Sequence, residues 1–200
     1  MSALLDSLTA AQEVNQTLYP ALNFALVVPG VYRSGHPQKS NFSHLDTLGL
    51  KSIMYLFKDD YLRDTHTWAL EKKLNIFHYR VEVSKDPTVE VDEAFVKEAL
   101  EKVLDTRNLP ILIHDNKGRL LPSLLSAIIR LISGWTLDAA LAEYRLFLPA
   151  VDDWVPEEAL EKALKKKKEK ERIADIHLID RFPVDSLTYD PQYAPSWLTR

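Results

Sequence analysis

The part of the sequence with the most chemical potential is the stretch 111–123. An apolar run ends at His114, polar residues from Asp115 to Gly118 follow, and an apolar segment with Pro122 near its start comes next. A buried strand that passes through a tight glycine-bearing loop into a helix directs backbone N–H groups and the positive end of the helix at one place. The pattern predicts an anion site. Because strand–loop–helix junctions are common, the surrounding residues must indicate which anion it serves.

Nine short segments between residues 20 and 150 stand in an order and at a spacing typical of one protein family. They are Asn23-Phe24, 30–35, Asn41-Phe42, 48–53, 104–108, 110–114, 116–118, Trp135 and Glu143-Tyr144. In these segments the chain resembles the plant and fungal atypical dual-specificity phosphatases, a branch of the cysteine-dependent protein tyrosine phosphatase superfamily. Within that family it is most similar to the fungal oxidant-induced cell-cycle-arrest proteins, several of which have altered catalytic loops.

The resemblance implies a degenerate catalytic loop. The family's loop reads His-Cys-Asn-Lys-Gly-Lys-His-Arg-Thr-Gly: its cysteine attacks phosphorus, and its arginine clamps two phosphate oxygens. The matching residues here are His114, Asp115, Asn116, Lys117, Gly118, Arg119, Leu120 and Leu121. Asp115 therefore stands at the nucleophile position and Leu121 at the arginine position. The chain contains no cysteine at all, so no displaced thiol can take over.

Either replacement is expected to stop the family's reaction. Loss of a covalent nucleophile costs about 10⁶-fold in rate, and loss of a phosphate-clamping arginine roughly 10³- to 10⁵-fold. Aspartate keeps a negative charge but is a weaker nucleophile with a shorter reach than a thiolate. Leucine has no planar guanidinium with which to grip two oxygens. No catalytic residue of the cysteine mechanism is retained.

Asp115 could in principle accept a phosphoryl group itself, as aspartyl-phosphate enzymes do. Those enzymes hold a magnesium ion with further carboxylates, and the residues near Asp115 are instead Lys117, Arg119 and leucines. We therefore expect no metal and no cofactor. The favoured interpretation is that the Asp115 carboxylate fills the anion site and accepts the N–H groups of the loop.

A second loop resembles one that lies over the pocket in the family. It contains Lys85, Asp86 and Pro87, and Asp86 is a candidate for a vestigial general acid. The alternative, which we favour, is a turn residue ahead of proline. Lys85, Lys117 and Arg119 could attract a polyphosphate, because several active relatives cleave inositol pyrophosphates; they could equally be solvated surface cations.

Three further polar residues near these loops are expected to be structural. His114 is interpreted as a residue that hydrogen-bonds the loop, without a metal. Arg33 and Arg130 are interpreted as ion-pair partners and not as ligand groups.

Apolar runs and helical spacings alternate along the chain. Strands are expected at 31–33, 52–57, 76–83 and 111–114, and helices at 41–48, 64–74, 92–104, 122–132 and 136–147. This alternation predicts an α/β sandwich with a mostly parallel central sheet flanked by helices, the fold class of the cysteine phosphatases that the chain resembles.

Three regions are expected: an N-terminal extension over 1–18, a phosphatase-like domain over 19–150, and a C-terminal region over 151–200. The last would begin with a charged helix from Pro156 to about Asp175, with lysines and Arg172 near its end on a solvated face. A proline-containing aromatic tail would follow and pack onto the domain or a partner.

Composition restricts the classes of partner. The 200 residues carry a net charge of −4, so no general basic field indicates nucleic acid. No secretory signal is recognised, and no apolar run approaches the roughly 18 residues of a membrane span. With no cysteine in the chain, we expect a reducing compartment, the cytoplasm or alternatively the nucleus.

Together these observations favour a pseudophosphatase that serves as a protein-interaction, scaffolding or regulatory subunit, with homologous phosphatase-like subunits as the first partners to test. One alternative is a sensor that binds inositol polyphosphates or pyrophosphates without hydrolysis. Another is residual tyrosine or inositol-pyrophosphate phosphatase activity.

Overall fold

The structure of the protein is a computed structural model that describes residues 17–84, 86–148 and 172–199. Nearly all of the expected N-terminal extension, Lys85 and most of the expected charged helix therefore lie outside the described residues. Within the described part, no helix is both long and apolar enough to cross a membrane.

A five-stranded sheet forms the centre of the protein. Its strands are β1 (Ala25–Val28), β2 (Val31–Ser34), β3 (Ser52–Leu56), β4 (Asn75–Tyr79) and β5 (Ile111–His114), in the order β1-β2-β5-β3-β4. The last four strands of that order run parallel, and β1 pairs antiparallel with β2 at the edge. The mostly parallel sheet is confirmed, whereas the edge strand β1 was not predicted.

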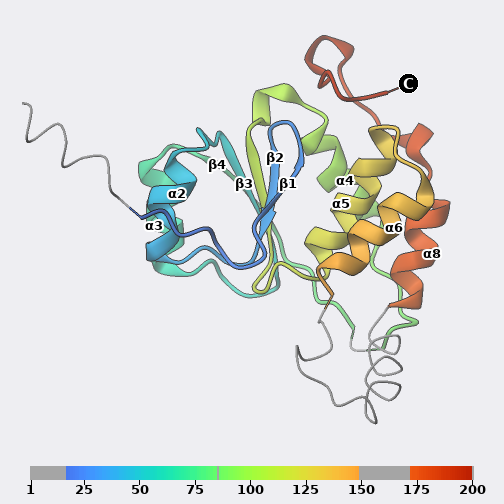
Figure 1. Cartoon of the computed structure of the whole chain (residues 1–200), viewed down its shortest axis with the longest axis horizontal. Helices are drawn as coiled ribbons and strands as arrows, with labels where there is room; N and C mark the ends of the chain where they lie inside the picture. The colour runs from blue at the N-terminus through green and yellow to red at the C-terminus, as the bar shows by residue number, and fades with distance from the viewer. Residues whose placement is uncertain (1–16, 85, 149–171, 200) are drawn as a thin grey trace, which may run out of the picture.

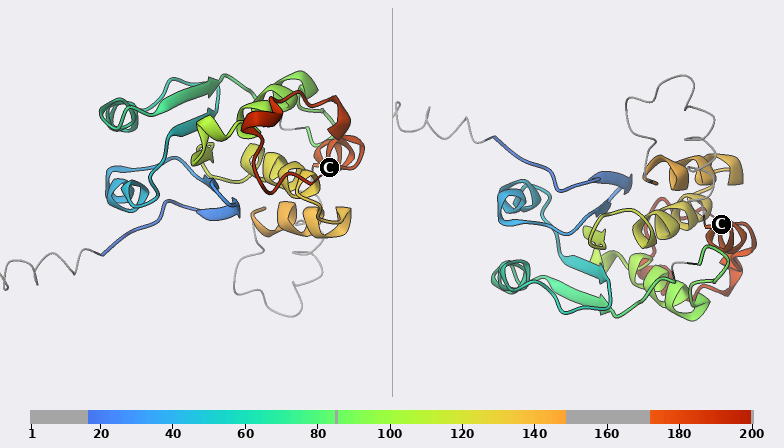
Figure 2. Two further views of the ribbon diagram at one scale, coloured as in Figure 1. Left: turned by 90° about the horizontal axis from the view of Figure 1, so that it is seen from above. Right: turned by 90° about the horizontal axis from the view of Figure 1, so that it is seen from below.

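Helices cover both faces of the sheet (Figures 1 and 2). One face carries α2 (Phe42–Asp46) and α3 (Arg63–Glu71), and the other carries α4 (Glu93–Val103), α5 (Leu121–Ile132), α6 (Leu137–Leu146) and α8 (Ile173–Arg181). Short 3₁₀ turns occur at Lys39–Asn41, Thr106–Asn108, Val184–Ser186 and Pro191–Tyr193. The described chain is thus a three-layer α/β sandwich.

Strand β5 lies in the middle of the sheet, and all four of its residues are completely buried. Successive side chains of a strand point to opposite faces. Ile111 and Ile113 accordingly join the larger apolar core under α5, and Leu112 joins the smaller core under α2 and α3. Because apolar layers cover both faces of β5, the loop that follows it has a rigid support.

The strand ends are in register. Ser34 of β2 and Tyr55 of β3 both lie opposite His114 of β5. In a parallel sheet, the segments that leave the carboxyl ends of the strands meet at one edge, which is where ligands bind in open α/β folds. The register therefore brings the loops after β2, β3 and β5 together.

Three expected boundaries were wrong. The helix expected to reach residue 74 ends at Glu71. The third strand was expected to reach residue 83, but it ends at Tyr79, since its partner β3 ends at Leu56 in the same register and offers no further ladder. A helix continuous to residue 175 is also contradicted, because Arg172 has extended backbone and caps a new helix, α8. The rest of that expected helix lies outside the described residues.

The C-terminal tail packs against the domain. Phe182 and Leu187 are buried in the larger core. The indole Nε1 of Trp197 donates to the Pro29 carbonyl at 3.1 Å, and the Thr199 hydroxyl donates to the Ile132 carbonyl at 3.2 Å. The tail therefore covers one end of the sheet next to the β1–β2 turn (Figure 1).

Candidate functional site

The loop between β5 and α5 is held against the end of β2 by two glycines. Gly118 has a φ of +67°, and a Cβ atom there would lie 2.5 Å from the Ser34 carbonyl carbon and overlap the Gly35 nitrogen. A Cβ on Gly35 would in turn lie 3.1 Å from the Lys117 carbonyl carbon. The loop can approach the neighbouring strand this closely only because neither position has a side chain.

Asp115 turns its carboxylate back into this loop. Its Oδ1 accepts the backbone N–H of Lys117 at 2.8 Å and also that of Gly118. The side chain lies in the interior, with Asp115 only 9% exposed. These local bonds are those of an Asx-type turn, and they engage two of the N–H groups of the loop.

The electrostatic surroundings of Asp115 act in two directions. Burial raises the pKa of its carboxyl above the usual range, whereas the backbone amides of Gly118, Lys117 and Arg119 and the charge of Arg33 oppose that rise. The carboxylate is thus partly desolvated and depends on the loop amides for its stability in the ionised form.

Leu121 is the first residue of α5, and its side chain packs into the larger apolar core with 2% of its surface exposed. The end of the helix next to the loop is therefore apolar. The side chain of Leu121 has no group that could donate a hydrogen bond to a phosphate oxygen.

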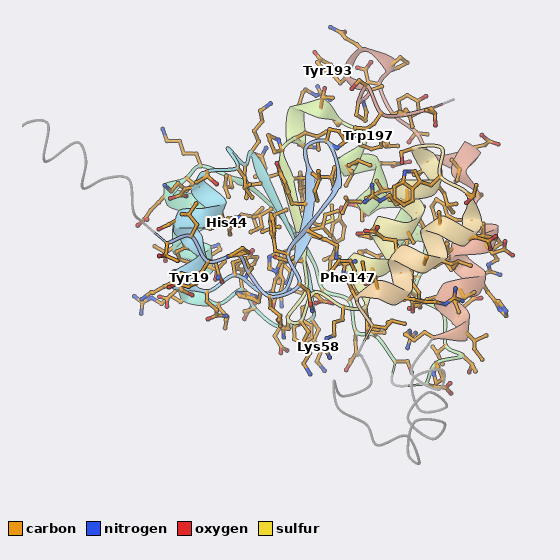
Figure 3. All side chains as sticks on the ribbon, viewed as in Figure 1. Tyr19, His44, Lys58, Phe147, Tyr193 and Trp197 are labelled. Atoms are coloured by element: carbon orange, nitrogen blue, oxygen red, sulfur yellow. The ribbon has the colours of Figure 1, made fainter. Side chains whose placement is uncertain are left out.

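Beside the loop is a cavity of about 670 Å³. Its walls come from residues 56–58, 81–84, 115–117 and 119–121, together with Pro87 and Arg172. Figure 3 shows Lys58, one of the wall residues, at the end of the sheet opposite Tyr193 and Trp197 of the C-terminal tail. The cavity is thus at the carboxyl edge of the parallel strands, away from the tail.

Arg172 is a wall residue that sequence reasoning assigned wrongly to a solvated helix face. It is 5% exposed, and its Nε donates to Asp175 Oδ1 at 3.1 Å. Nη1 donates to the carbonyls of Ser84 and Asp86, and Nη2 donates to that of Val89 at 2.6 Å. The guanidinium therefore ties α8 to the segment after β4.

These contacts also decide whether Arg172 can replace the missing clamp. A guanidinium has five N–H donors, and four of those of Arg172 are engaged by protein acceptors. Asp175 is fixed in turn by the Tyr144 hydroxyl at 2.9 Å. Arg172 is consequently a support of the cavity wall. In the sequence, the lysines that precede Arg172 suggested an exposed helix face. Asp175, three residues later, was the signal that could have indicated a buried ion pair.

The two cations of the loop differ from Arg172. Lys117 and Arg119 both line the cavity, and within the described part of the chain their side chains have no hydrogen-bond or ion-pair partner. The nearby Lys58, by contrast, is paired with Glu82 at 2.6 Å. Lys117 and Arg119 are therefore the cavity cations available to an anionic ligand.

Asp86 has the geometry of a turn residue. Its exposed carboxylate accepts the backbone N–H of Thr88 at 2.9 Å and the Thr88 hydroxyl at 2.7 Å, and these bonds lower its pKa. A carboxyl that stays ionised is poorly suited to proton donation. Asp86 also does not line the cavity, and Lys85 lies outside the described residues.

Comparison with known proteins identifies the family of this fold. The tyrosine phosphatase family matches residues 18–179. The chain belongs to this family. It is 33% identical over 172 residues to "Inositol diphosphatase DSP4" of Arabidopsis thaliana, covering 86% of this chain and 77% of that protein.

Yeast relatives support the same assignment. The chain is 34% identical over 135 residues to "Inositol diphosphatase SIW14" of Saccharomyces cerevisiae, covering 67% of this chain and about half (48%) of the yeast protein. The solved Siw14 catalytic core superposes with a TM-score of 0.70 at 31% identity, covering 86% of this chain and 90% of that one. The phosphatase fold expected from the sequence is therefore confirmed.

In this phosphatase-family chain, Arg33 supports the loop from behind. It is fully buried, and its Nη2 donates to the Gly118 carbonyl and, at 2.9 Å, to the Ser123 hydroxyl. The Phe147 ring lies 3.7 Å from the guanidinium carbon. Burial lowers the pKa of Arg33 to about 10, and the nearby carboxylates of Glu143 and Asp115 oppose that shift.

Arg130 lies on α5, on the same side of the sheet. It pairs with Glu143 at 3.3 Å and stacks on Trp135. Neither Arg33 nor Arg130 lines the cavity. The ion pair expected of Arg130 is present, whereas among the described residues Arg33 is held by hydrogen bonds and the Phe147 ring and not by an ion pair.

Behind the loop lies a cluster of histidine and tyrosine rings that sequence reasoning largely missed. His114 Nε2 and the Tyr61 hydroxyl are 2.6 Å apart, and the Tyr55 ring stacks on His114 with centroids 4.9 Å apart. The Tyr55 hydroxyl donates to Asn116 Oδ1 at 3.0 Å, and the His36 ring contacts His114 edge-on. The cluster fixes the start of the loop. Among the described residues, no three His, Asp or Glu side chains group as metal ligands.

This cluster makes stability depend on pH. Burial lowers the pKa of His36 to about 4 and lowers that of His114 well below its usual value. In the unfolded chain both histidines titrate near 6.5, so between about pH 6.5 and 4 the unfolded state binds more protons and acidification destabilises the fold. For His36 the full loss is about 3 kcal/mol.

Urea unfolding between pH 7 and 4.5 measures this effect. His36→Gln is expected to flatten the fall in the free energy of unfolding, whereas His177→Gln, at an exposed position on α8, keeps the slope of the original protein. An unchanged slope in His36→Gln contradicts the assignment.

Proposed function

We propose that the protein is a non-hydrolysing member of the tyrosine phosphatase family, a pseudophosphatase that acts as a protein-interaction, scaffolding or regulatory subunit. The main support is the position of Asp115, whose carboxylate accepts the loop amides of Lys117 and Gly118. These amides are the groups that a phosphate would need. The chain also contains no cysteine, so it has no thiolate that could form a phosphoryl intermediate.

Phosphate binding at the loop would meet three obstacles. The ligand would have to displace a carboxylate that is already hydrogen-bonded, and its charge would be repelled by that carboxylate at short range. Leu121 offers only an apolar surface at the start of α5. The buried guanidinium of Arg172 in the cavity wall is engaged by Asp175 and by three carbonyls.

Homologous phosphatase-like subunits are the first proposed partners. Two apolar side chains of the tail, Phe182 and Leu187, are buried in the chain's own core. Tyr193, Trp197 and Leu198 are only partly buried, and they are the apolar part of the tail that a partner could contact. A pull-down with the full chain, followed by mass spectrometry, tests this role: recovery of phosphatase-family proteins in stoichiometric amounts supports it.

Turnover of an inositol pyrophosphate tests the loss of activity. Both relatives described above are named as inositol diphosphatases, so an inositol pyrophosphate is the appropriate substrate and the yeast Siw14 catalytic core the positive control. We expect no phosphate release above background from this chain, with or without magnesium. Release that disappears in Asp115→Ala would establish the third candidate, residual phosphatase activity, and contradict the proposal.

The second candidate, a sensor of inositol polyphosphates, rests on Lys117 and Arg119 at the cavity, whose side chains have no partner among the residues that the structure describes. Calorimetry with an inositol pyrophosphate distinguishes it. Saturable binding that is weakened by both Lys117→Ala and Arg119→Ala would favour the sensor.

A further inference from the structure

We infer that the cavity beside the loop binds a soluble organic anion with an apolar body, such as an aryl sulfonate or a medium-chain fatty acid. The inference rests on the proposed function, because it assumes that the loop amides are not available to phosphate. It assigns to this cavity a ligand class other than phosphate esters.

The walls of the cavity are strongly apolar. Its volume of about 670 Å³ lies within the range of small-molecule sites. The accessible apolar surface comes from partly exposed side chains: Phe57 after β3, Val81 and Val83 after β4, Pro87, and Leu120 at the start of α5. Leu56 and Leu121 also line the cavity but are almost completely buried in the core. Burying such surface stabilises a complex by roughly 25 cal/mol per Å² removed from water.

Most of the polar groups in the walls are already satisfied. Asp115 is bonded to the loop amides, Arg172 to carbonyls and Asp175, and Lys58 to Glu82. Within the described residues this leaves Lys117 and Arg119 as cations without a partner, two positions apart on the same loop. The cavity is therefore suited to a ligand with one anionic group, which Lys117 and Arg119 would bind.

These two properties together select the ligand class. A compact polyanion would place charge against the apolar walls and near Asp115, in a protein whose net charge is already −4. A neutral hydrocarbon would leave both cations without a counter-charge. An amphiphilic anion matches both the apolar walls and the two cations, with its head on Lys117 and Arg119 and its apolar body against Val83 and Leu120.

The probe for the test is 1-anilinonaphthalene-8-sulfonate, an aryl sulfonate whose fluorescence increases in apolar surroundings. Added to the full chain at neutral pH, it is expected to give a saturable single-site enhancement that decanoate reverses. Reversing both cations, in Lys117→Glu with Arg119→Glu, should weaken the binding by about tenfold or more. Lys51→Glu, an exposed position at the other end of β3, is the matched control and should bind as the original protein does.

Further measurements distinguish a specific site in the cavity from a loosened core and from a membrane-binding surface. Leu120→Asn should also weaken binding, and near-ultraviolet circular dichroism of each variant must match the original, so that a loosened core is not mistaken for a site. Equal binding by the double Glu variant and by Lys51→Glu overturns the inference, as does an enhancement that decanoate leaves unchanged. Co-sedimentation with phosphatidylserine vesicles that depends on Lys117 and Arg119 would assign the cavity to a membrane surface and also overturn it.

Orthovanadate distinguishes failure of this inference from failure of the proposed function. Vanadate is therefore titrated by calorimetry without the probe. Millimolar or tighter binding to the original protein that is lost in Asp115→Ala shows that the loop accepts phosphate-like anions, and the proposed function is wrong. If neither vanadate nor the probe binds, the inference alone is wrong.

Discussion

Replacing Gly118 with alanine is expected to lower the free energy of unfolding by about 3 kcal/mol or more. The backbone of Gly118 is in the left-handed region, with φ of +67°, and the new methyl group would collide with the backbone of Ser34 and Gly35. Backbone atoms of a buried strand cannot move aside as a flexible side chain can, so the loop must leave the end of β2. The hydrogen bonds from the loop to Asp115 would be lost with it.

Gly49→Ala is the matched control for this variant. Gly49 also has a positive φ, of +60°, but a Cβ atom there meets nothing within 4 Å. It should therefore show only the backbone penalty, of about 1 kcal/mol. Urea unfolding of the two variants side by side measures the difference. Equal losses would mean that the close approach of the loop to β2 contributes nothing to stability.

Replacing Asp115 with alanine is expected to destabilise the protein by about 1–3 kcal/mol and to make its stability depend on anions. The variant leaves the N–H groups of Lys117 and Gly118 without the acceptor that they have in the original protein. Sulfate or phosphate can then occupy the vacated position, and a ligand that binds only the folded state raises stability by mass action.

Thermal unfolding in increasing phosphate, at constant ionic strength, measures this dependence. The melting temperature of Asp115→Ala should rise with phosphate relative to chloride, whereas that of the original protein should not. Asp86→Ala, which alters an exposed carboxylate outside the cavity, is the control and should behave as the original protein does. The same response in all three proteins would mean that phosphate acts elsewhere.

Local sequence patterns predicted the core of this fold well. The spacing of apolar residues placed α5 within one residue of its observed start, and Thr136 does cap α6, with its hydroxyl accepting the Ala139 N–H. The order of strand, glycine-bearing loop and helix around Asp115 predicted that its carboxylate would accept loop amides, as it does. These features depend on residues close together in the chain.

The features that were missed depend on distant residues. Strand β1 has only four residues, two of them not fully buried, and its existence depends on pairing with β2. Arg172 acquires its role from carbonyls more than eighty positions earlier. The close approach of Gly118 to Gly35 likewise follows from strand order and register, which no local pattern contains.

The central claim is that Asp115 fills the anion site of a phosphatase loop and so excludes phosphate. Calorimetric titration of orthovanadate into the original protein at neutral pH tests it most directly, with Asp115→Ala titrated in parallel. We predict no saturable heat with the original protein up to millimolar vanadate, and measurable binding to the variant. Millimolar or tighter binding to the original protein, lost in Asp115→Ala, would contradict the account.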